Sequence, residues 1–143
     1  MKDSFNKEII GRLERVDIPE FNLAGIEAKV DTGAYSGAIH VSLVSEFERD
    51  GKDWIRFVLL DEDHPEFHNK VYETDVFEEK SIRSSNGTVQ HRYAVPVTII
   101  LKGKALKVDL SLSNRKDLKY PILLGRKIIK KDFIVDASKT FTE

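Results

Sequence analysis

Apolar and polar residues alternate through most of the chain, which is the pattern of strands with one buried face. The alternation is clearest in two neighbouring runs. The apolar positions of the first run are Val95, Val97, Ile99 and Leu101, and those of the second are Leu106, Val108, Leu110 and Leu112. Lys102-Gly103 lies between the runs and predicts a hairpin turn.

Further strands are predicted upstream of this hairpin. A mostly apolar strand covers residues 54–60, after a turn at residues 49–52, and a longer extended stretch covers residues 70–83. Asn86-Gly87 then predicts a second hairpin, because both residues tolerate positive φ. Thr88 is expected to begin the returning strand.

Helical periodicity is scarce. A short helix is predicted at residues 126–131, with Ile128 and Ile129 facing inward, and Phe133–Val135 follows as a closing strand. Pro96, inside a strand pattern, indicates an edge or a bulge. Without repeats or linkers, residues 1–143 are predicted to be one all-β domain of roughly eight short strands, closed or barrel-like, with one short C-terminal helix.

Composition narrows the function classes. The chain has 143 residues, of which 41% are hydrophobic, and its formal charge is −1. This balance favours neither nucleic acid nor an anionic membrane as a partner. There is no cysteine for a disulfide, a thiolate metal site or a nucleophile, and no apolar signal core near residue 1. We therefore expect a cytoplasmic protein.

The candidate chemistry lies at Asp31-Thr32-Gly33-Ala34, where an apolar strand runs into a carboxylate, a hydroxyl and a glycine. Such a turn places the carboxylate where backbone N–H groups can orient it. Asp and Gly are also ordinary turn residues, so the triplet alone indicates only a turn. A second segment, residues 120–126, is an apolar strand that ends in Gly125-Arg126 before the short helix.

These segments, in this order, resemble those of the retropepsin-like aspartic proteases. The resemblance implies that the late apolar strand packs behind the catalytic turn and that the hairpin at Asn86-Gly87 is a flap over substrate. Residues 50–80 look like an insertion relative to the viral enzymes. No cofactor is implied.

The likeness is closer to a bacterial and archaeal subfamily that carries the label ATP-dependent zinc protease. Its members are associated with RimK-type ATP-grasp ligases, which add glutamates to protein tails. The resemblance therefore implies acidic peptides as substrates and a functional link to such a ligase. The shared residues are Asp31-Thr32-Gly33-Ala34, Ala38, His40, Arg83-Ser84-Ser85-Asn86-Gly87, Ser113-Asn114-Arg115, Tyr120-Pro121, Leu124-Gly125-Arg126 and Val135-Asp136.

Aspartic proteolysis needs two carboxylates that share one proton. The chain has one Asp-Thr-Gly and is too short for two lobes, and neither Asp109 nor Asp136 has the glycine turn. A homodimer is therefore predicted, in which Asp31 pairs with its symmetry mate. Thr32 is expected to brace the pair and Gly33 to permit the turn.

Substrate contacts are expected from the turn, the flap and nearby arginines. In viral retropepsins the position of Tyr35 holds a carboxylate that pairs with the arginine of Gly-Arg. Arg126 is therefore expected either to find another acid, such as Asp136, or to serve a substrate carboxylate. The alternative is that the arginines brace loops and the dimer. The candidate residues are Ala34, Arg83, Ser84, Ser85, Asn86, Gly87, Arg92 and Arg126, with Arg115 as a further arginine.

Metal and serine chemistry find little support. His64 and His68 have the spacing of a zincin pair, but Pro65 between them predicts a loop with exposed histidines. His40 is expected to pack or to fix a hydrogen bond, and His91 to lie on a strand surface. Asp61-Glu62-Asp63 predicts a solvated turn, and no metal ligand is assigned. No Gly-x-Ser-x-Gly elbow and no phosphate-binding glycine loop is present.

Two functions of different classes remain. The first is a peptidase that depends on Asp31 and on dimerisation. The second is a peptide-binding module that uses the same barrel without cutting, because a fold does not guarantee chemistry. The oligomeric state separates the two, since a strict monomer cannot assemble the pair of carboxylates.

Overall fold

The computed structural model describes residues 6–83 and 85–142. Its strands are β1 (Glu8–Ile10), β2 (Leu13–Ile18), β3 (Leu23–Val30), β4 (Gly37–Arg49), β5 (Lys52–Leu59), β6 (Val71–Thr74), β7 (Glu78–Arg83), β8 (Val89–Leu101), β9 (Lys104–Ser113), β10 (Ile122–Leu124) and β11 (Phe133–Val135). A 3-10 helix, η1 (Pro19–Phe21), and an α-helix, α2 (Arg126–Ile129), complete the description.

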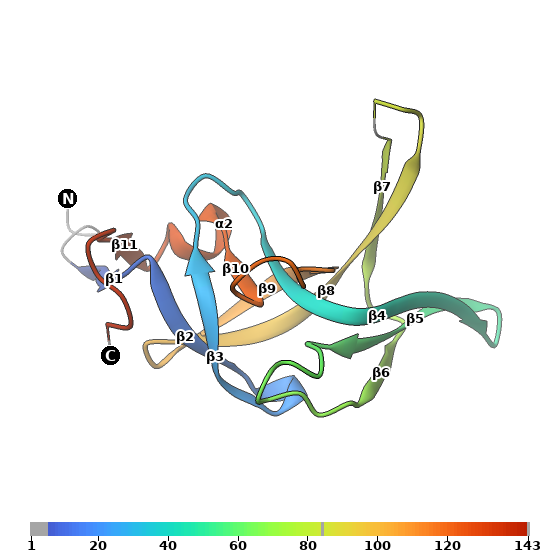
Figure 1. Ribbon diagram of the computed structural model, residues 1–143, viewed down its shortest axis with the longest axis horizontal. Helices are drawn as coiled ribbons and strands as arrows, with labels where there is room; N and C mark the ends of the chain where they lie inside the picture. The colour runs from blue at the N-terminus through green and yellow to red at the C-terminus, as the bar shows by residue number, and fades with distance from the viewer. Residues whose placement is uncertain (1–5, 84, 143) are drawn as a thin grey trace.

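Six of the strands close into a barrel (Figure 1). The order is β10-β3-β2-β8-β9-β4, and β4 pairs with β10 to complete the circle. The short strand β10 makes this closure, because it lies parallel to β3 on one side and antiparallel to β4 on the other. The predicted all-β closed barrel with one short C-terminal helix is confirmed.

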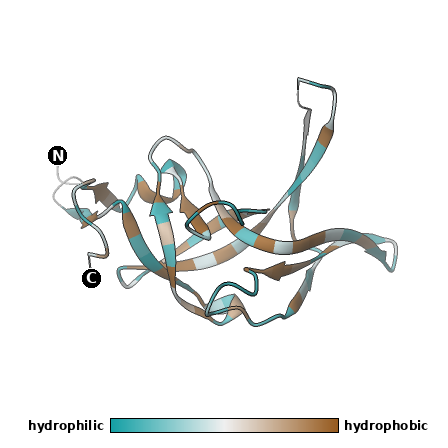
Figure 2. Ribbon diagram, in the orientation of Figure 1, coloured by the Kyte–Doolittle hydropathy of each residue, from teal (hydrophilic) through white to brown (hydrophobic). Residues whose placement is uncertain are grey.

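The barrel interior is filled by the inward positions of the alternating strands (Figure 2). In β8 the four predicted core positions, Val95, Val97, Ile99 and Leu101, are all buried. The partner strand β9 buries Leu110 and Leu112 and leaves Leu106 and Val108 partly covered. Period-two alternation therefore predicts the core well, since each strand has one face in the barrel and one outside.

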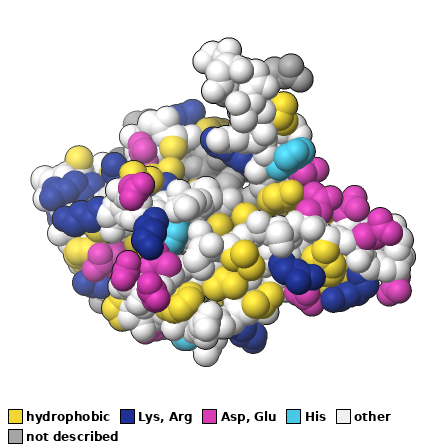
Figure 3. All heavy atoms as spheres, turned by 45° about the vertical axis from the view of Figure 1, so that its right-hand side comes forward, with side chains coloured by type: hydrophobic (Ala, Val, Ile, Leu, Met, Phe, Trp, Pro, Cys, Tyr) yellow, Lys and Arg dark blue, Asp and Glu magenta, His cyan; other side chains and the backbone are white. Residues whose placement is uncertain are grey.

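Two hairpins extend beyond the barrel (Figure 1). Strands β4 and β5 continue as a long antiparallel pair, with β6 on the outer edge of β5. Strands β7 and β8 form the hairpin that contains Asn86-Gly87, which confirms the turn predicted there. In the space-filling view this second hairpin stands clear of the rest of the surface (Figure 3).

The strand count exceeds the sequence-based expectation. The described residues form eleven strands rather than about eight. The expected single stretch over residues 70–83 is two strands, β6 and β7, which pair with different neighbours. Three strands, β1, β2 and β4, had not been predicted, and the two strands expected from Thr88 and at residues 95–101 are one strand, β8.

The structure explains why Pro96 fits within β8. The neighbouring Thr98 turns its N–H away from β9 and donates it to the carboxylate of Glu20 at 2.7 Å. Pro96, two residues earlier, faces the same way. On this side β8 pairs with β7 up to Ala94 and with β2 at Ile100. Pro96 therefore lies at a local edge, as predicted, where no ladder hydrogen bond is lost.

The two chain ends meet beside the barrel. β1 pairs in parallel with β11, and Leu13 bridges to Thr140. The carboxylate of Glu14, which is 1% exposed, accepts hydrogen bonds from the N–H of Gly11 and from both the N–H and the hydroxyl of Thr142. Within residues 6–83 and 85–142, no helix is long and apolar enough to cross a membrane.

Candidate active site

The Asp-Thr-Gly turn follows β3 directly. The N–H of Asp31 donates to the carbonyl of Leu124 in β10 at 2.9 Å, and the Asp31 carboxylate oxygen Oδ1 accepts the N–H of Gly33 at 2.9 Å. The N–H of Ala34 returns to the Asp31 carbonyl at 3.2 Å. The late apolar strand therefore packs behind the turn, as the resemblance implied, and the turn holds a half-buried carboxylate at its mouth.

Gly125 lets the corner between β10 and α2 lie directly beneath the turn. A Cβ at this position would come within 2.3 Å of the Ser36 carbonyl oxygen and within 2.7 Å of the Tyr35 carbonyl. Behind this close approach, the N–H of Arg126 donates to Ala34 and that of Lys127 donates to Tyr35, each at 2.8 Å. The Gly-Arg motif thus supports the Asp-Thr-Gly turn.

Arg126 has partners even though position 35 holds a tyrosine instead of a carboxylate. Asp136 is not one of them. Nη1 of Arg126 donates to the carbonyl of Thr32 at 3.0 Å, and its guanidinium carbon lies 5.7 Å from the centre of the Tyr35 ring. The carboxylate of Asp136 instead accepts the hydroxyl and the N–H of Ser138, and these two bonds hold its pKa below the usual value. The expected acid is therefore replaced by a carbonyl and an aromatic face.

A groove of about 610 Å³ runs from the turn along β8 and β9. Tyr35, Ser36 and Gly37 line one end, and Arg92 and Lys80 from the β7–β8 hairpin line another part. Asp31 is not among the lining residues. The groove thus connects the turn with the base of the hairpin rather than enclosing the carboxylate.

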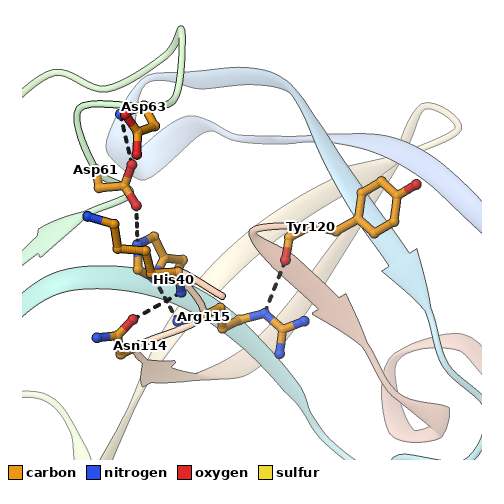
Figure 4. Close-up of polar contacts among 7 residues, drawn as sticks. His40, Asp61, Asp63, Asn114, Arg115 and Tyr120 are labelled. Atoms are coloured by element: carbon orange, nitrogen blue, oxygen red, sulfur yellow. Dashed lines mark hydrogen bonds and ion pairs between the residues drawn. The ribbon is translucent and has the colours of Figure 1, made fainter. Parts of the chain in front are cut away.

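His40 ties three segments together outside the barrel wall (Figure 4). Its Nδ1 accepts the N–H of Arg115 at 2.8 Å, so the ring proton lies on Nε2, which donates to Asp61 at 2.6 Å. The expectation that His40 fixes a hydrogen bond is confirmed. Asp61 is more than a solvated turn residue. Its pKa is lowered by the N–H of Asp63, then by His40 and Lys116, against the opposing effect of burial.

The other predicted substrate-binding residues lie in the β7–β8 hairpin. Ser85, Asn86 and Gly87 form the β7–β8 turn. Ser84 lies outside the described residues, as does the side chain of Arg83. Arg92 is exposed on β8, opposite Lys80 of β7.

The remaining histidines occupy surface positions. His64 and His68 lie in the loop after β5, where His64 accepts the N–H of Glu66 and His68 is exposed. His91 is exposed on β8 and pairs with Glu79 at 3.0 Å. In the described part of the chain, no group of three or more His, Cys, Asp or Glu side chains could hold a metal ion.

Sequence reasoning did not predict the structural roles of two acidic residues, Asp61, which was expected only in a solvated turn, and Glu14. Asp61 acquires its role only when the loop after β5 meets β4. Glu14, in contrast, could have been found, because it shares the period-two face of Val16 and Ile18, which are buried with it. An acid on an apolar face indicates a buried carboxylate with dedicated donors.

The family model for RimB-like proteins, described as retropepsin-like aspartic endopeptidase RimB, matches residues 9–143. A probable alpha-L-glutamate ligase of Shewanella halifaxensis is 36% identical over 142 residues, which cover 96% of this chain and 30% of the ligase. One from Desulfotalea psychrophila is 31% identical over 140 residues, covering 95% of this chain and 29% of the ligase. The chain thus spans about 30% of the length of these curated relatives.

A crystal structure of a Legionella pneumophila protein of unknown function has the same fold. The two chains share 29% sequence identity at a TM-score of 0.72, over 94% of this chain and 97% of that one. The family match covers the Asp31 turn, the β7–β8 hairpin and the Gly125-Arg126 corner, and the barrel carries all three in the arrangement described above. The chain therefore belongs to the RimB-like family of retropepsin-like aspartic endopeptidases.

Proposed function

We propose that residues 1–143 form one peptidase domain that hydrolyses peptide bonds through Asp31 and the Asp31 of a second copy. The observation that carries the proposal is the turn itself. Asp31 has a carboxylate at the mouth of a supported turn, with Gly33 donating to one oxygen and the other oxygen left for a partner. Thr32 and Gly33 are the accompanying catalytic-turn residues.

A homodimer is part of this proposal, because one carboxylate cannot do the chemistry. Two carboxylates about 3 Å apart share a proton, since both cannot ionise at that distance. The ionised member takes a proton from the attacking water, while the protonated member donates to the carbonyl oxygen of the scissile bond. The pair then titrates with joint pKa values. Sedimentation of the free protein tests the dimer directly.

Acidic or glutamate-rich tails are the substrate class that we propose. The relatives named probable alpha-L-glutamate ligase contain a region similar to this whole chain, which supports a functional link between this domain and glutamate addition. Such ligation products carry carboxylates, and arginine suits their recognition. Arg92 lines the groove beside the turn. We place the reaction in the cytoplasm, with no metal or cofactor.

Mass-spectrometric cleavage of peptides with oligoglutamate tails tests the proposal, with wild type compared with Asp31→Asn, each with and without EDTA. Cleavage that resists EDTA and is lost in Asp31→Asn would establish aspartic chemistry. No cleavage by either protein at any pH would favour a peptide-binding module. Unchanged cleavage by Arg92→Ala and Arg126→Ala dimers would exclude these two arginines from substrate recognition.

A further inference from the structure

The loop between β9 and β10 holds Arg115 in one position by bonds to both its backbone and its side chain. Its N–H donates to His40 Nδ1 at 2.8 Å, and its side-chain Nε donates to the Tyr120 carbonyl at 3.2 Å, across the loop. The loop is further fixed because Leu118 N–H donates to the Arg115 carbonyl at 2.8 Å. The guanidinium is therefore placed before any ligand arrives.

The two terminal nitrogens of Arg115 remain for a ligand. They point away from His40 and Asp61 (Figure 4), and Arg115 forms no ion pair with any residue in 6–83 or 85–142. The nearby acid Asp61 has other partners, because the N–H of Asp63, the His40 ring and the charge of Lys116 lower its pKa. Burial lowers the pKa of Arg115, with no carboxylate opposing the effect. A half-buried cation without an anion is an unfavourable arrangement that an incoming carboxylate relieves.

Arg115 lies on the same face of the barrel wall as the catalytic carboxylate. The inward positions of β3, β4 and β10 are buried, among them Ala28, Ile39 and Ile122. The outward positions pair across the strands as Lys29, Leu123 and Ala38. Asp31 and His40 each follow an outward residue by two positions, so both lie on this outer face. Arg115 contacts His40 there.

The spacing along this face suits an extended peptide. Leu124 accepts the N–H of Asp31, and Tyr120, four residues earlier, accepts Nε of Arg115. Four residues of fully extended chain span about 13 Å, and Pro121 lies at a bend before β10, so the two carbonyls are at most about this far apart. A substrate in extended conformation that is cut at Asp31 can therefore present a side chain at Arg115 about four residues from the scissile bond.

From these observations we infer that Arg115 is a carboxylate-binding residue of the substrate site, which fixes an acidic group about four residues from the scissile bond. The inference rests on the proposed function for its substrate class. The two planar Nη groups match a carboxylate in a bidentate contact. The hydrogen bond from Nε to the Tyr120 carbonyl removes much of the entropy cost of ordering the side chain. His40 and Asp61 are positioning residues for this site.

The test measures binding rather than cleavage. The Asp31→Asn protein leaves peptides intact, so the affinity of fluorescein-labelled hexaglutamate is followed by fluorescence anisotropy, with hexaglutamine as the neutral probe. Arg115→Gln should weaken hexaglutamate binding about 10- to 100-fold, as expected for a charge-assisted bidentate contact. Arg115→Lys should recover only part of this loss, because an ammonium lacks the fork geometry. Hexaglutamine binding should be the same in all three proteins.

Arg49→Gln is the matched control, because it removes the same charge from the far end of β4. Nine extended residues separate it from His40, about 30 Å, well beyond the screening length of about 8 Å at physiological salt. Its hexaglutamate affinity should stay within about twofold of the parent, as expected for a screened charge. If Arg115→Gln does not keep the circular-dichroism spectrum of the parent, the comparison rests on Arg115→Lys.

Two further arms locate the carboxylate. Replacing each glutamate of the peptide by glutamine in turn should abolish the effect of Arg115→Gln at one position only. A C-terminally amidated peptide distinguishes a side-chain carboxylate from the terminal one. Equal affinity of parent and Arg115→Gln for hexaglutamate, or no hexaglutamate binding by the parent, overturns the inference. Cleavage by wild type that is lost in Asp31→Asn would still support the proposed peptidase in either case.

Discussion

Gly125→Ala should displace the Asp-Thr-Gly turn through a steric clash alone. The backbone at Gly125 has φ −90°, which alanine adopts without strain, so the effect comes from the added Cβ. This atom would lie 2.3 Å from the Ser36 carbonyl oxygen, whereas ordinary contact begins at 3.4 Å. The turn must therefore move away from the β10–α2 corner by about 1 Å, since the corner itself is buried and packed.

The magnitude follows from the contacts that this movement strains. Overpacking of this kind costs about 1–3 kcal/mol. The hydrogen bonds from Arg126 N–H to Ala34 and from Lys127 N–H to Tyr35 each contribute about 0.5–1.5 kcal/mol. We expect Gly125→Ala to lower the free energy of unfolding by about 2–6 kcal/mol in urea titrations. Peptide cleavage should fall about 100-fold in the molecules that remain folded, because a 1 Å misplacement has that effect.

Gly33→Ala is the matched comparison within the same turn. Its added Cβ would lie 3.1 Å from Oδ1 of Asp31 and within 4 Å of no other described atom outside the adjacent residues, so a shift of a few tenths of an ångström relieves the contact. Stability should fall by no more than about 1 kcal/mol at this exposed position, while cleavage falls because the carboxylate moves. If Gly125→Ala unfolds within about 0.5 kcal/mol of wild type, the close packing of the corner beneath the turn is refuted.

Three further predictions concern buried or paired polar groups. Burial, together with Glu46 and Glu79, raises the pKa of Tyr93 from 10.0 to about 12, so Tyr93→Phe should remove the latest phenol step in an absorbance titration at high pH. Because the neutral phenol is favoured in the folded state, its contribution is complete below about pH 10 and is lost as the pH rises towards 12; an unchanged titration would contradict this. The pKa of Asp61 is lowered from 3.8, so the stability difference between wild type and Asp61→Asn should be constant near neutral pH and shrink only as the pH falls below that value in urea titrations. Thr142→Val removes a hydroxyl donor from the buried Glu14 carboxylate and should lower the free energy of unfolding by about 1–3 kcal/mol; thermal and urea unfolding equal to wild type would exclude this role for the chain end.

Much of the barrel was predictable because its information is local. A strand that has one face inside a barrel repeats its apolar residues every two positions, so β8 and β9 and the Lys102-Gly103 turn between them were predicted from their own residues. The short helix was predicted for the same reason, and its inward residues Ile128 and Ile129 are buried. Closure of the barrel was a weaker inference, since it depends on β10 pairing with two strands that are distant in sequence.

The surroundings of the site were harder to predict, because the hydrogen-bond partners there come from segments that are distant in sequence. The sequence shows that Tyr35 replaces the usual carboxylate, but it does not show that Arg126 turns to the Thr32 carbonyl and to the ring of Tyr35 itself. Nor does it show that His40 joins Asp61 to the backbone of Arg115, since these residues come from three separate segments. A motif identifies which residues carry chemistry, whereas the partners of those residues depend on contacts that only the folded chain provides.

The arrangement of the two arginines separates support from recognition. The guanidinium of Arg126 contacts the turn, where it donates to the Thr32 carbonyl and lies near the Tyr35 ring. Removal of Arg126 should therefore disturb the position of Asp31 before it changes any preference for acidic peptides. Arg115 is held by its backbone and its Nε, and its terminal nitrogens form no ion pair with a described residue. A loss of turnover with Arg126→Ala and a loss of acidic-peptide affinity with Arg115→Gln would therefore be different defects. We therefore assign the Gly-Arg motif to support of the turn, and the proposed selectivity for acidic groups to the loop before β10.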